Sequence, residues 1–202
     1  MTTRIRNLLV VSALLWLATG CSLLPGPAPV ATDQYVLEYE AAGKPPGPDA
    51  PVLIVTTPRA HGGYDTPRMA YMQQAYGLRY SSLSSWADTP ARMLAPLLAD
   101  ALQGTGKFQA LYTSPGSITA DLRLDTELVR LHHDFTRQPS AVQLTLRAQL
   151  VDARKGRVIA TRQFDVSVVA ETEDAYGGVV AANRAVGQFL PELAQFCTVG
   201  HD

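Results

Sequence analysis

Cysteine is nearly missing from this chain of 202 residues, which contains two, at positions 21 and 197. Two cysteines cannot build the framework of several disulfides that holds small secreted domains together, so the fold must rest on a hydrophobic core. Charge is also scarce: charged residues make up 17% of the chain, and the formal net charge is −1. Without a basic excess there is no electrostatic case for binding nucleic acid or an anionic membrane surface.

A hydrophobic run long enough to span a membrane is missing too. The apolar segment Leu8–Leu17 follows Arg4 and Arg6 near the start of the chain. It is shorter than the about 20 apolar residues that a membrane-spanning helix needs. A short basic start followed by an apolar run of this length is typical of a secretory signal peptide.

The residues that close this segment, Leu17-Ala18-Thr19-Gly20-Cys21, form the pattern of a bacterial lipobox, with Ala18 where leucine is usual. We predict that residues 1–20 are removed and that Cys21 is acylated and becomes the N-terminus. The alternative is an ordinary signal peptide cut near Cys21, which leaves a free thiol. Residues 1–20 contain Arg4 and Arg6 and no acid, so the 17 basic residues become 15 against 18 acidic ones. Membrane attachment must then come from lipid on Cys21, since several acyl chains anchor a protein firmly.

Residues 21–33 are predicted to be the tether behind this anchor. Prolines at 25, 27 and 29, with Gly26, favour an extended and semi-rigid chain. At about 3 Å per residue, the tether would hold a domain on the order of 35 Å from the lipid. The domain is predicted over residues 34–197. Cys197 lies on an apolar helical face and is predicted to be a small buried hydrophobe, with a Cys21–Cys197 disulfide as the alternative.

Apolar periodicity predicts the elements of this domain. Strands are expected at 34–40 and 52–57, and a hairpin at 68–73 and 78–86, with a loop at 41–51 because of its prolines. Thr89 and Pro90 are typical of a helix start, and Gly104 of its end, with a kink expected at Pro96. Alternating apolar residues predict three antiparallel strands at 121–128, 142–150 and 158–169, and an amphipathic helix follows at 175–197. We therefore expect a single α/β domain, with a mixed, mostly antiparallel sheet and two helices packed on one face.

Residues with catalytic or metal-binding chemistry form no motif in this sequence. His132-His133-Asp134 is the one cluster of possible ligands, but neighbouring residues of a strand point to opposite faces, so the two histidines cannot readily share a metal ion. We expect them to be exposed at the end of a strand. Asp121, Asp125 and Glu127 alternate with apolar residues and are expected on a solvated strand face. Nucleophile elbows and phosphate-binding loops are missing as well, so we predict no enzyme, no cofactor and no metal.

Aromatic residues make up 7% of the chain, yet five of them fall between positions 64 and 86, beside methionines and arginines. Tyrosine, tryptophan, methionine and arginine are enriched at protein interfaces. We predict a partner-docking surface here, and the alternative is that these are ordinary core and hairpin residues. The candidate docking residues are Tyr64, Arg68, Tyr71, Tyr80 and Trp86.

Several stretches of this region resemble the ABC-type transport auxiliary lipoproteins, the PqiC-like group. They are Gly63-Tyr64-Asp65-Thr66-Pro67-Arg68-Met69-Ala70-Tyr71, Leu78-Arg79-Tyr80, and Trp86-Ala87-Asp88-Thr89-Pro90-Ala91-Arg92-Met93-Leu94, with Tyr35-Val36-Leu37 before them and Ala181-Ala182-Asn183-Arg184-Ala185 after them. The resemblance covers about residues 33–196. It implies a lipid-anchored domain with a TolB N-terminal-like fold.

The resemblance also implies a non-enzymatic role in intermembrane lipid transport. The partners would be an ABC permease, an ATPase and an MCE-domain protein, and a homo-oligomeric ring would suit docking to a tubular partner. Ser22, rather than aspartate, after Cys21 is consistent with sorting to the outer membrane, with the domain facing the periplasm. Two alternatives stay open: a lipoprotein that itself carries a lipid in a pocket under the helices, and an envelope hydrolase.

Overall fold

The computed structural model describes residues 32–41, 43, 45–112 and 119–199. These residues belong to one compact unit, Thr32–Asp202. The predicted signal peptide, Cys21 and nearly all of the predicted tether lie outside the described residues. Within the described part, no helix combines the length and the apolar character that crossing a membrane requires.

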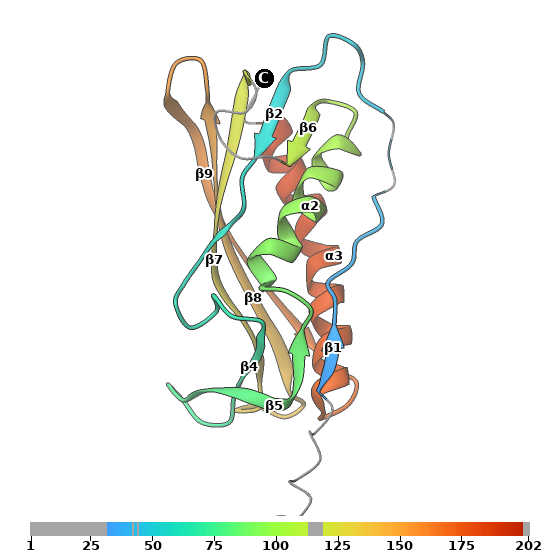
Figure 1. The fold of residues 1–202 in the computed structure, drawn as a ribbon, viewed down its shortest axis with the longest axis vertical. Helices are drawn as coiled ribbons and strands as arrows, with labels where there is room; N and C mark the ends of the chain where they lie inside the picture. Colours follow the sequence, from blue (N-terminus) through green and yellow to red (C-terminus); the bar gives the residue numbers. More distant parts are fainter. Residues whose placement is uncertain (1–31, 42, 44, 113–118, 200–202) are drawn as a thin grey trace, which may run out of the picture. The chain divides into compact units, whose positions relative to one another are not determined.

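Three long antiparallel strands run the length of the sheet: β7 (Leu122–Asp134), β8 (Ala141–Asp152) and β9 (Arg157–Val169) (Figure 1). Their apolar residues alternate, so that cross-strand pairs such as Leu124 with Leu150 lie fully buried on one face. Each such leucine contributes about 1.5–3 kcal/mol by burial. The predicted alternating strands are confirmed, and β7 continues past residue 128 to Asp134.

The other edge of β7 is shared by three short parallel partners that follow one another along it. They are β2 (Val52–Val55), β3 (Arg59–Ala60) and β4 (Arg68–Met72). Beyond them lie β6 (Gln109–Tyr112) beside β2, β5 (Leu78–Trp86) antiparallel to β4, and β1 (Asp33–Tyr35) parallel to β5. The sheet is therefore mixed, as predicted.

Strand β1 is shorter than the predicted strand at 34–40. After Tyr35 the chain leaves the sheet edge and runs along the second helix, where the side chain of Asn183 takes over the backbone hydrogen bonds. The Glu38 amide donates to Asn183 Oδ1 at 2.8 Å, and Asn183 Nδ2 donates to the Val36 carbonyl at 3.2 Å. This exchange ends the strand without leaving these backbone groups unpaired.

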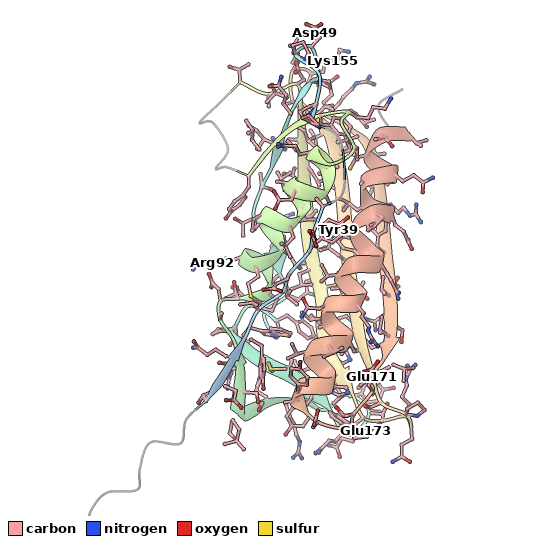
Figure 2. All side chains as sticks on the ribbon, turned by 90° about the vertical axis from the view of Figure 1, so that its right-hand side faces the viewer. Tyr39, Asp49, Arg92, Lys155, Glu171 and Glu173 are labelled. Atoms are coloured by element: carbon pink, nitrogen blue, oxygen red, sulfur yellow. The ribbon has the colours of Figure 1, made fainter. Side chains whose placement is uncertain are left out.

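Two helices cover one face of the sheet, α2 (Pro90–Gln103) and α3 (Ala175–Val199) (Figures 1 and 2). Their buried residues, including Leu94, Leu98, Phe189 and Leu193, form one core with the inward leucines of β7 and β8. Both helices continue past the prolines inside them. The predicted architecture, a mixed sheet with two helices on one face, is confirmed.

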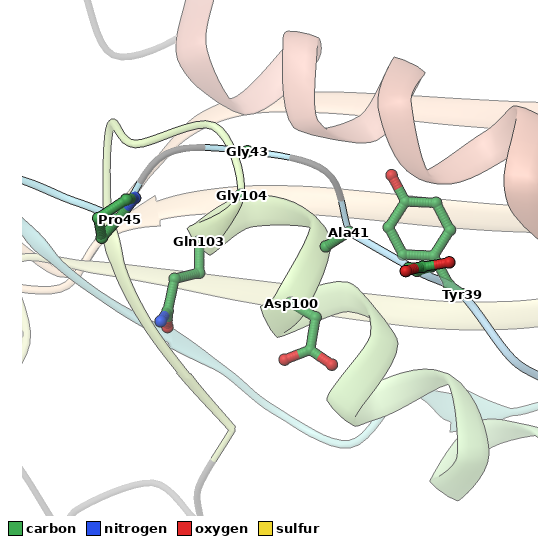
Figure 3. Close-up of a pocket in the computed structure, with 8 residues that line it drawn as sticks. Tyr39, Ala41, Gly43, Pro45, Asp100, Gln103 and Gly104 are labelled. Carbon is green, nitrogen blue, oxygen red and sulfur yellow. The ribbon is translucent and has the colours of Figure 1, made fainter.

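The ends of α2 differ in part from expectation. Thr89 precedes the helix as predicted, but its side chain makes no capping hydrogen bond. Gly104 follows the helix, and its carbonyl lies so close to Gly43 that a Cβ atom on Gly43 would sit 1.7 Å from the Gly104 oxygen. Figure 3 shows this approach of the 39–45 segment to the end of α2. The two backbones can meet here because Gly43 has no side chain.

The face of the sheet away from the helices carries polar side chains. Glu127 pairs with Arg147 at 2.9 Å, and Arg130 pairs with Asp165 at 3.2 Å across three strands. These side chains are between 28% and 50% exposed, so each pair contributes no more than about 1 kcal/mol. Asp121, Asp125 and Glu127 are all partly exposed, as expected for a solvated strand face.

Candidate functional site

One end of the unit gathers the predicted docking residues. We call it the hairpin end, and it comprises the β4–β5 hairpin, β1 and the first turn of α3 (Figure 1). The predicted hairpin is confirmed, and its turn places Tyr76 at a backbone φ of 64° with 99% of its surface exposed. A positive φ is uncommon for a residue with a side chain. The hairpin tip therefore presents an aromatic ring to its surroundings.

Arg68 and Tyr80 form a fixed pair on the hairpin. The guanidinium carbon of Arg68 lies 4.0 Å from the centroid of the Tyr80 ring. The Tyr80 hydroxyl donates a hydrogen bond to the carbonyl of Gly63 at 2.9 Å. A cation over a tyrosine ring contributes about 0.5–1 kcal/mol at an exposed site. Because both side chains are already positioned, they would lose little rotamer entropy on meeting a partner.

Tyr64 lies against the sheet and is partly internal. Its hydroxyl is 3.0 Å from His132 Nδ1, and the two rings are stacked with centroids 6.0 Å apart. Burial raises the pKa of Tyr64 above its ordinary value and lowers that of His132. Only part of the Tyr64 side chain is therefore accessible at this surface.

Trp86 does not belong to the docking surface, and this part of the prediction is wrong. Its side chain is in the hydrophobic core, and the residue is 4% exposed. Its backbone amide donates to the Pro67 carbonyl at 2.7 Å, and it pairs with Tyr35 of β1. The indole lies inside because it belongs to the core under the helices, where it lines a small space together with Gly178 and Ala182 of α3. The packing of Trp86 in the core thus attaches the end of the hairpin to the rest of the domain.

The two histidines of β7 are buried, each 6% exposed, which corrects the expectation of exposed strand-end residues. The reason is that β7 does not end before them: β4 pairs with His133 on one side and β8 on the other. Their rings point to opposite faces, His132 toward Tyr64 and His133 toward Gly178 of α3. Across the described residues, no group of three or more His, Cys, Asp or Glu side chains is placed to hold a metal ion.

His133 and Ser140 form a buried hydrogen-bonded pair that the sequence did not reveal and that extends to the exposed Glu173. The His133 Nε2 atom is 2.8 Å from Ser140 Oγ, and the Ser140 amide donates to Glu173 Oε1 at 2.9 Å. Hydrogen bonds from the Ser140 backbone and side chain lower the pKa of Glu173. Serine, histidine and glutamate are also hydrolase residue types, but Ser140 is 0% exposed. In this structure these hydrogen bonds connect the loop after β7 to the segment before α3.

An apolar hollow opens at the hairpin end, and we call it the hairpin hollow. Its volume is about 210 Å³. Aromatic rings form much of its wall: Phe135 contacts His133 with ring centroids 4.0 Å apart and meets Tyr71 edge-on at 6.2 Å. The lining comes from β4, β5, the end of β7 and the start of α3, and consists of Met69, Tyr71, Gln73, Ser81, His133, Phe135 and Ala175.

Two larger hollows are polar and open. One, of about 420 Å³, lies between the 39–45 segment and the end of α2 and has Glu40 and Asp100 in its lining (Figure 3). The other, of about 400 Å³, lies at the end opposite the hairpin. Two of the three acids in its lining pair with cations, Asp121 with Arg154 and Asp152 with Lys155. Neither hollow offers a carboxyl group in the apolar setting that a general acid needs.

Cys197 is buried in the core at 0% exposure, as predicted for a small hydrophobe. Burial raises the pKa of its thiol to about 12. A thiol with such a pKa forms almost no thiolate at neutral pH and is therefore a poor nucleophile. Its predicted alternative partner, Cys21, lies outside the described residues.

Comparison with known families decides the class of the protein. The model of the ABC-type transport auxiliary lipoprotein component matches residues 35–194. The chain belongs to this family. The resemblance seen in the Tyr-Asp-Thr-Pro-Arg and Trp-Ala-Asp-x-Pro stretches is thus confirmed. As a family member, this auxiliary lipoprotein is a component of an ABC-type transport system and a lipoprotein of the cell envelope.

Solved structures share the fold of this auxiliary lipoprotein. The protein XCC0632 from Xanthomonas campestris, of the DUF330 family, is 23% identical, with a TM-score of 0.74 over 84% of this chain and 97% of that one. A second crystal structure, of an uncharacterized protein, is 14% identical, with a TM-score of 0.67 over 82% and 98% of the two chains. At these identities the likeness shows the fold alone. The comparison with curated proteins gave no match.

Proposed function

We propose that this auxiliary lipoprotein is the outer-membrane docking subunit of an ABC/MCE-type system for intermembrane lipid transport, and that it acts without catalysis. The observation that carries the proposal is the family match, which spans nearly all of the described unit. The absence of a sequence motif for catalysis agrees with it. So does the burial of Ser140, which keeps that hydroxyl from any substrate in the described conformation.

The anchor is proposed to be lipid on Cys21, with residues 21–33 as the tether and residues 34–197 as the domain facing the periplasm. The described chain begins at Thr32, next to β1, and thus enters the unit at the hairpin end. Cys21 and Thr32 are 11 residues apart, which limits the span between them to about 40 Å. The hairpin end would therefore stay near the membrane, with room for a partner to reach it.

The docking surface is proposed to be the exposed side of the hairpin, with Tyr64, Arg68 and Tyr80, while Tyr71 lines the hairpin hollow at the same end. The rigid Arg68–Tyr80 pair is the kind of anchor that carries binding energy at interfaces. Its partner would be the MCE-domain protein of the system, connected to the ABC permease and ATPase. Several copies arranged as a ring would present this surface around a tubular partner.

A pull-down from membranes tests this function. The tagged chain should recover an MCE-domain protein and the permease, and Arg68→Glu should lower that recovery at least about tenfold, since the loss of one interface hot spot costs about 2 kcal/mol or more. Arg92→Glu is the matched control, because Arg92 is 68% exposed on α2 and forms a long 3.7 Å contact with Asp88. Recovery of no MCE or ABC component would overturn the proposal.

Fractionation tests the anchor separately. Cys21→Ala should move the protein from the membrane to the soluble fraction, because the proposed attachment is the lipid on Cys21 and no helix of the described unit is long and apolar enough to cross a membrane. A Cys21→Ala chain that stays in the membrane fraction would show that the lipid on Cys21 is not the anchor.

A further inference from the structure

The hairpin hollow has the chemistry of a site for an aliphatic chain. Its walls are Met69, Tyr71, Phe135 and Ala175, and the polar groups in its lining include the neutral side chains of Gln73 and Ser81. Ligand sites are typically concave, mostly apolar and edged by a few polar groups. We propose that this hollow binds the end of one acyl chain of a membrane phospholipid. This deepens the proposed function and rests on it for the source of the lipid.

The volume of the hollow sets how much of a chain it accepts. A methylene group takes about the same volume as a water molecule in the liquid, about 30 Å³, so 210 Å³ holds about seven methylene groups. Behind it lies a further space of about 20 Å³, beyond Met69 and His133. The hollow therefore grips the end of a chain and does not enclose a whole lipid, which distinguishes it from the pocket of a carrier.

The position of the hollow argues for a membrane lipid as its occupant. Ala175, on its wall, is next to Tyr176, which contacts Tyr35 of β1 with ring centroids 6.2 Å apart. The hollow thus lies at the end of the unit where the described chain begins, and the chain length between Cys21 and Thr32 limits their separation to about 40 Å. Tyr76, Leu83 and Tyr176 are exposed at the same end by 99%, 56% and 61%. Tyrosines are enriched at the level of lipid headgroups, where one end of the ring is apolar and the other wet.

A chain-length series tests the site. The chain from residue 21 onward, carrying Cys21→Ser, retains the whole compact unit. It is titrated with hexyl, octyl, decyl and dodecyl phosphocholine below their micelle concentrations, by calorimetry. Affinity should rise about fourfold per methylene while the chain enters the hollow and level off after about seven. An affinity that does not depend on chain length, or that rises without levelling off, would overturn the proposal.

A filling variant locates the binding. Ala175→Leu adds about three carbons inside the hollow, so the affinity of this variant should no longer rise between hexyl and dodecyl phosphocholine, and its affinity for dodecyl phosphocholine should fall about 60-fold. Gln188→Leu adds an apolar side chain to an exposed position of the same helix and should change neither the chain-length dependence nor the affinity. Contacts between the alkyl chain and the Met69 methyl group, seen as NMR cross-peaks in the unsubstituted chain, do not depend on how the variant folds. Their absence at saturation would also overturn the site.

The lipidated protein distinguishes the two possible sources of an acyl chain in the hollow, a membrane phospholipid and the protein's own lipid on Cys21. If phospholipid is the occupant, the mature protein lipidated on Cys21 should bind the probes as the Cys21→Ser chain does. Loss of probe binding there would mean that the protein's own lipid fills the hollow, which would overturn the assignment to phospholipid. The pull-down and this titration fail independently, because one reports protein partners and the other reports the hollow.

Discussion

Replacing Gly178 with alanine would place a methyl group against the ring of His133. A Cβ atom built on Gly178 lies 2.7 Å from His133 Nδ1 and 3.3 Å from its Cγ. The ring cannot easily turn away, because Ser140 holds its other nitrogen at 2.8 Å and the Phe135 ring packs against it with centroids 4.0 Å apart. Overpacking of this kind costs about 1–3 kcal/mol, and we expect the upper part of that range.

Helix propensity acts in the opposite direction, since alanine stabilises a helix interior by about 1 kcal/mol relative to glycine. Gly178→Ala should therefore lower the free energy of unfolding by about 2 kcal/mol net. Gly187 on the same helix is the matched control, because a Cβ atom there meets nothing within 4 Å. Gly187→Ala should therefore raise the free energy of unfolding by the full gain in helix propensity, about 1 kcal/mol. The two variants should thus differ by about 3 kcal/mol, or about 6–12 °C in Tm for a unit of this size.

Urea unfolding followed by circular dichroism, with linear extrapolation, measures this difference. A His133→Ala background then isolates its cause: with the ring gone, Gly178→Ala and Gly187→Ala should stabilise by similar amounts. Equal stability of the two variants in the native background would refute the close packing of His133 on α3. A difference that survives His133→Ala would show that some other contact is responsible.

Three further predictions concern the buried residues. Burial lowers the pKa of His132 and His133 from the ordinary 6.5, so the unfolded chain binds more protons below that pH. The free energy of unfolding should fall as the pH drops from 6.5 to about 5, by up to about 1.4 kcal/mol per pH unit for each histidine, and a flat profile in urea titrations would contradict this. Cys197 should resist iodoacetamide in the native protein at pH 8 and react once urea is added, and labelling of the native protein, read by mass spectrometry, would refute its burial. Trp86→Ala should lower the free energy of unfolding, measured in urea, by about 3–5 kcal/mol, whereas a decrease below 1 kcal/mol would refute the burial of Trp86.

The alternation of apolar and polar residues was enough to predict the meander of β7, β8 and β9, because such strands have one face in the core and one in water. It did not predict how far β7 extends. A register shift between Leu128 and Arg130 breaks the two-residue period, so the pattern after it no longer reads as the same strand. The burial of His133 follows from this continuation and from β4 and β8 on either side.

By itself the sequence determined the family, the two helices, the mixed sheet and the absence of a catalytic motif, since these depend on local patterns and on stretches close together in the chain. Only the tertiary structure decided which aromatic residues face outward. Trp86 and Arg68 belong to the same hairpin, yet one is in the core and the other is on the surface, because Trp86 packs beside Gly178 and Ala182 of α3, which comes from the far end of the chain. The hairpin hollow has the same origin: its walls come from residues 69 to 175, and long-range packing alone brings them together.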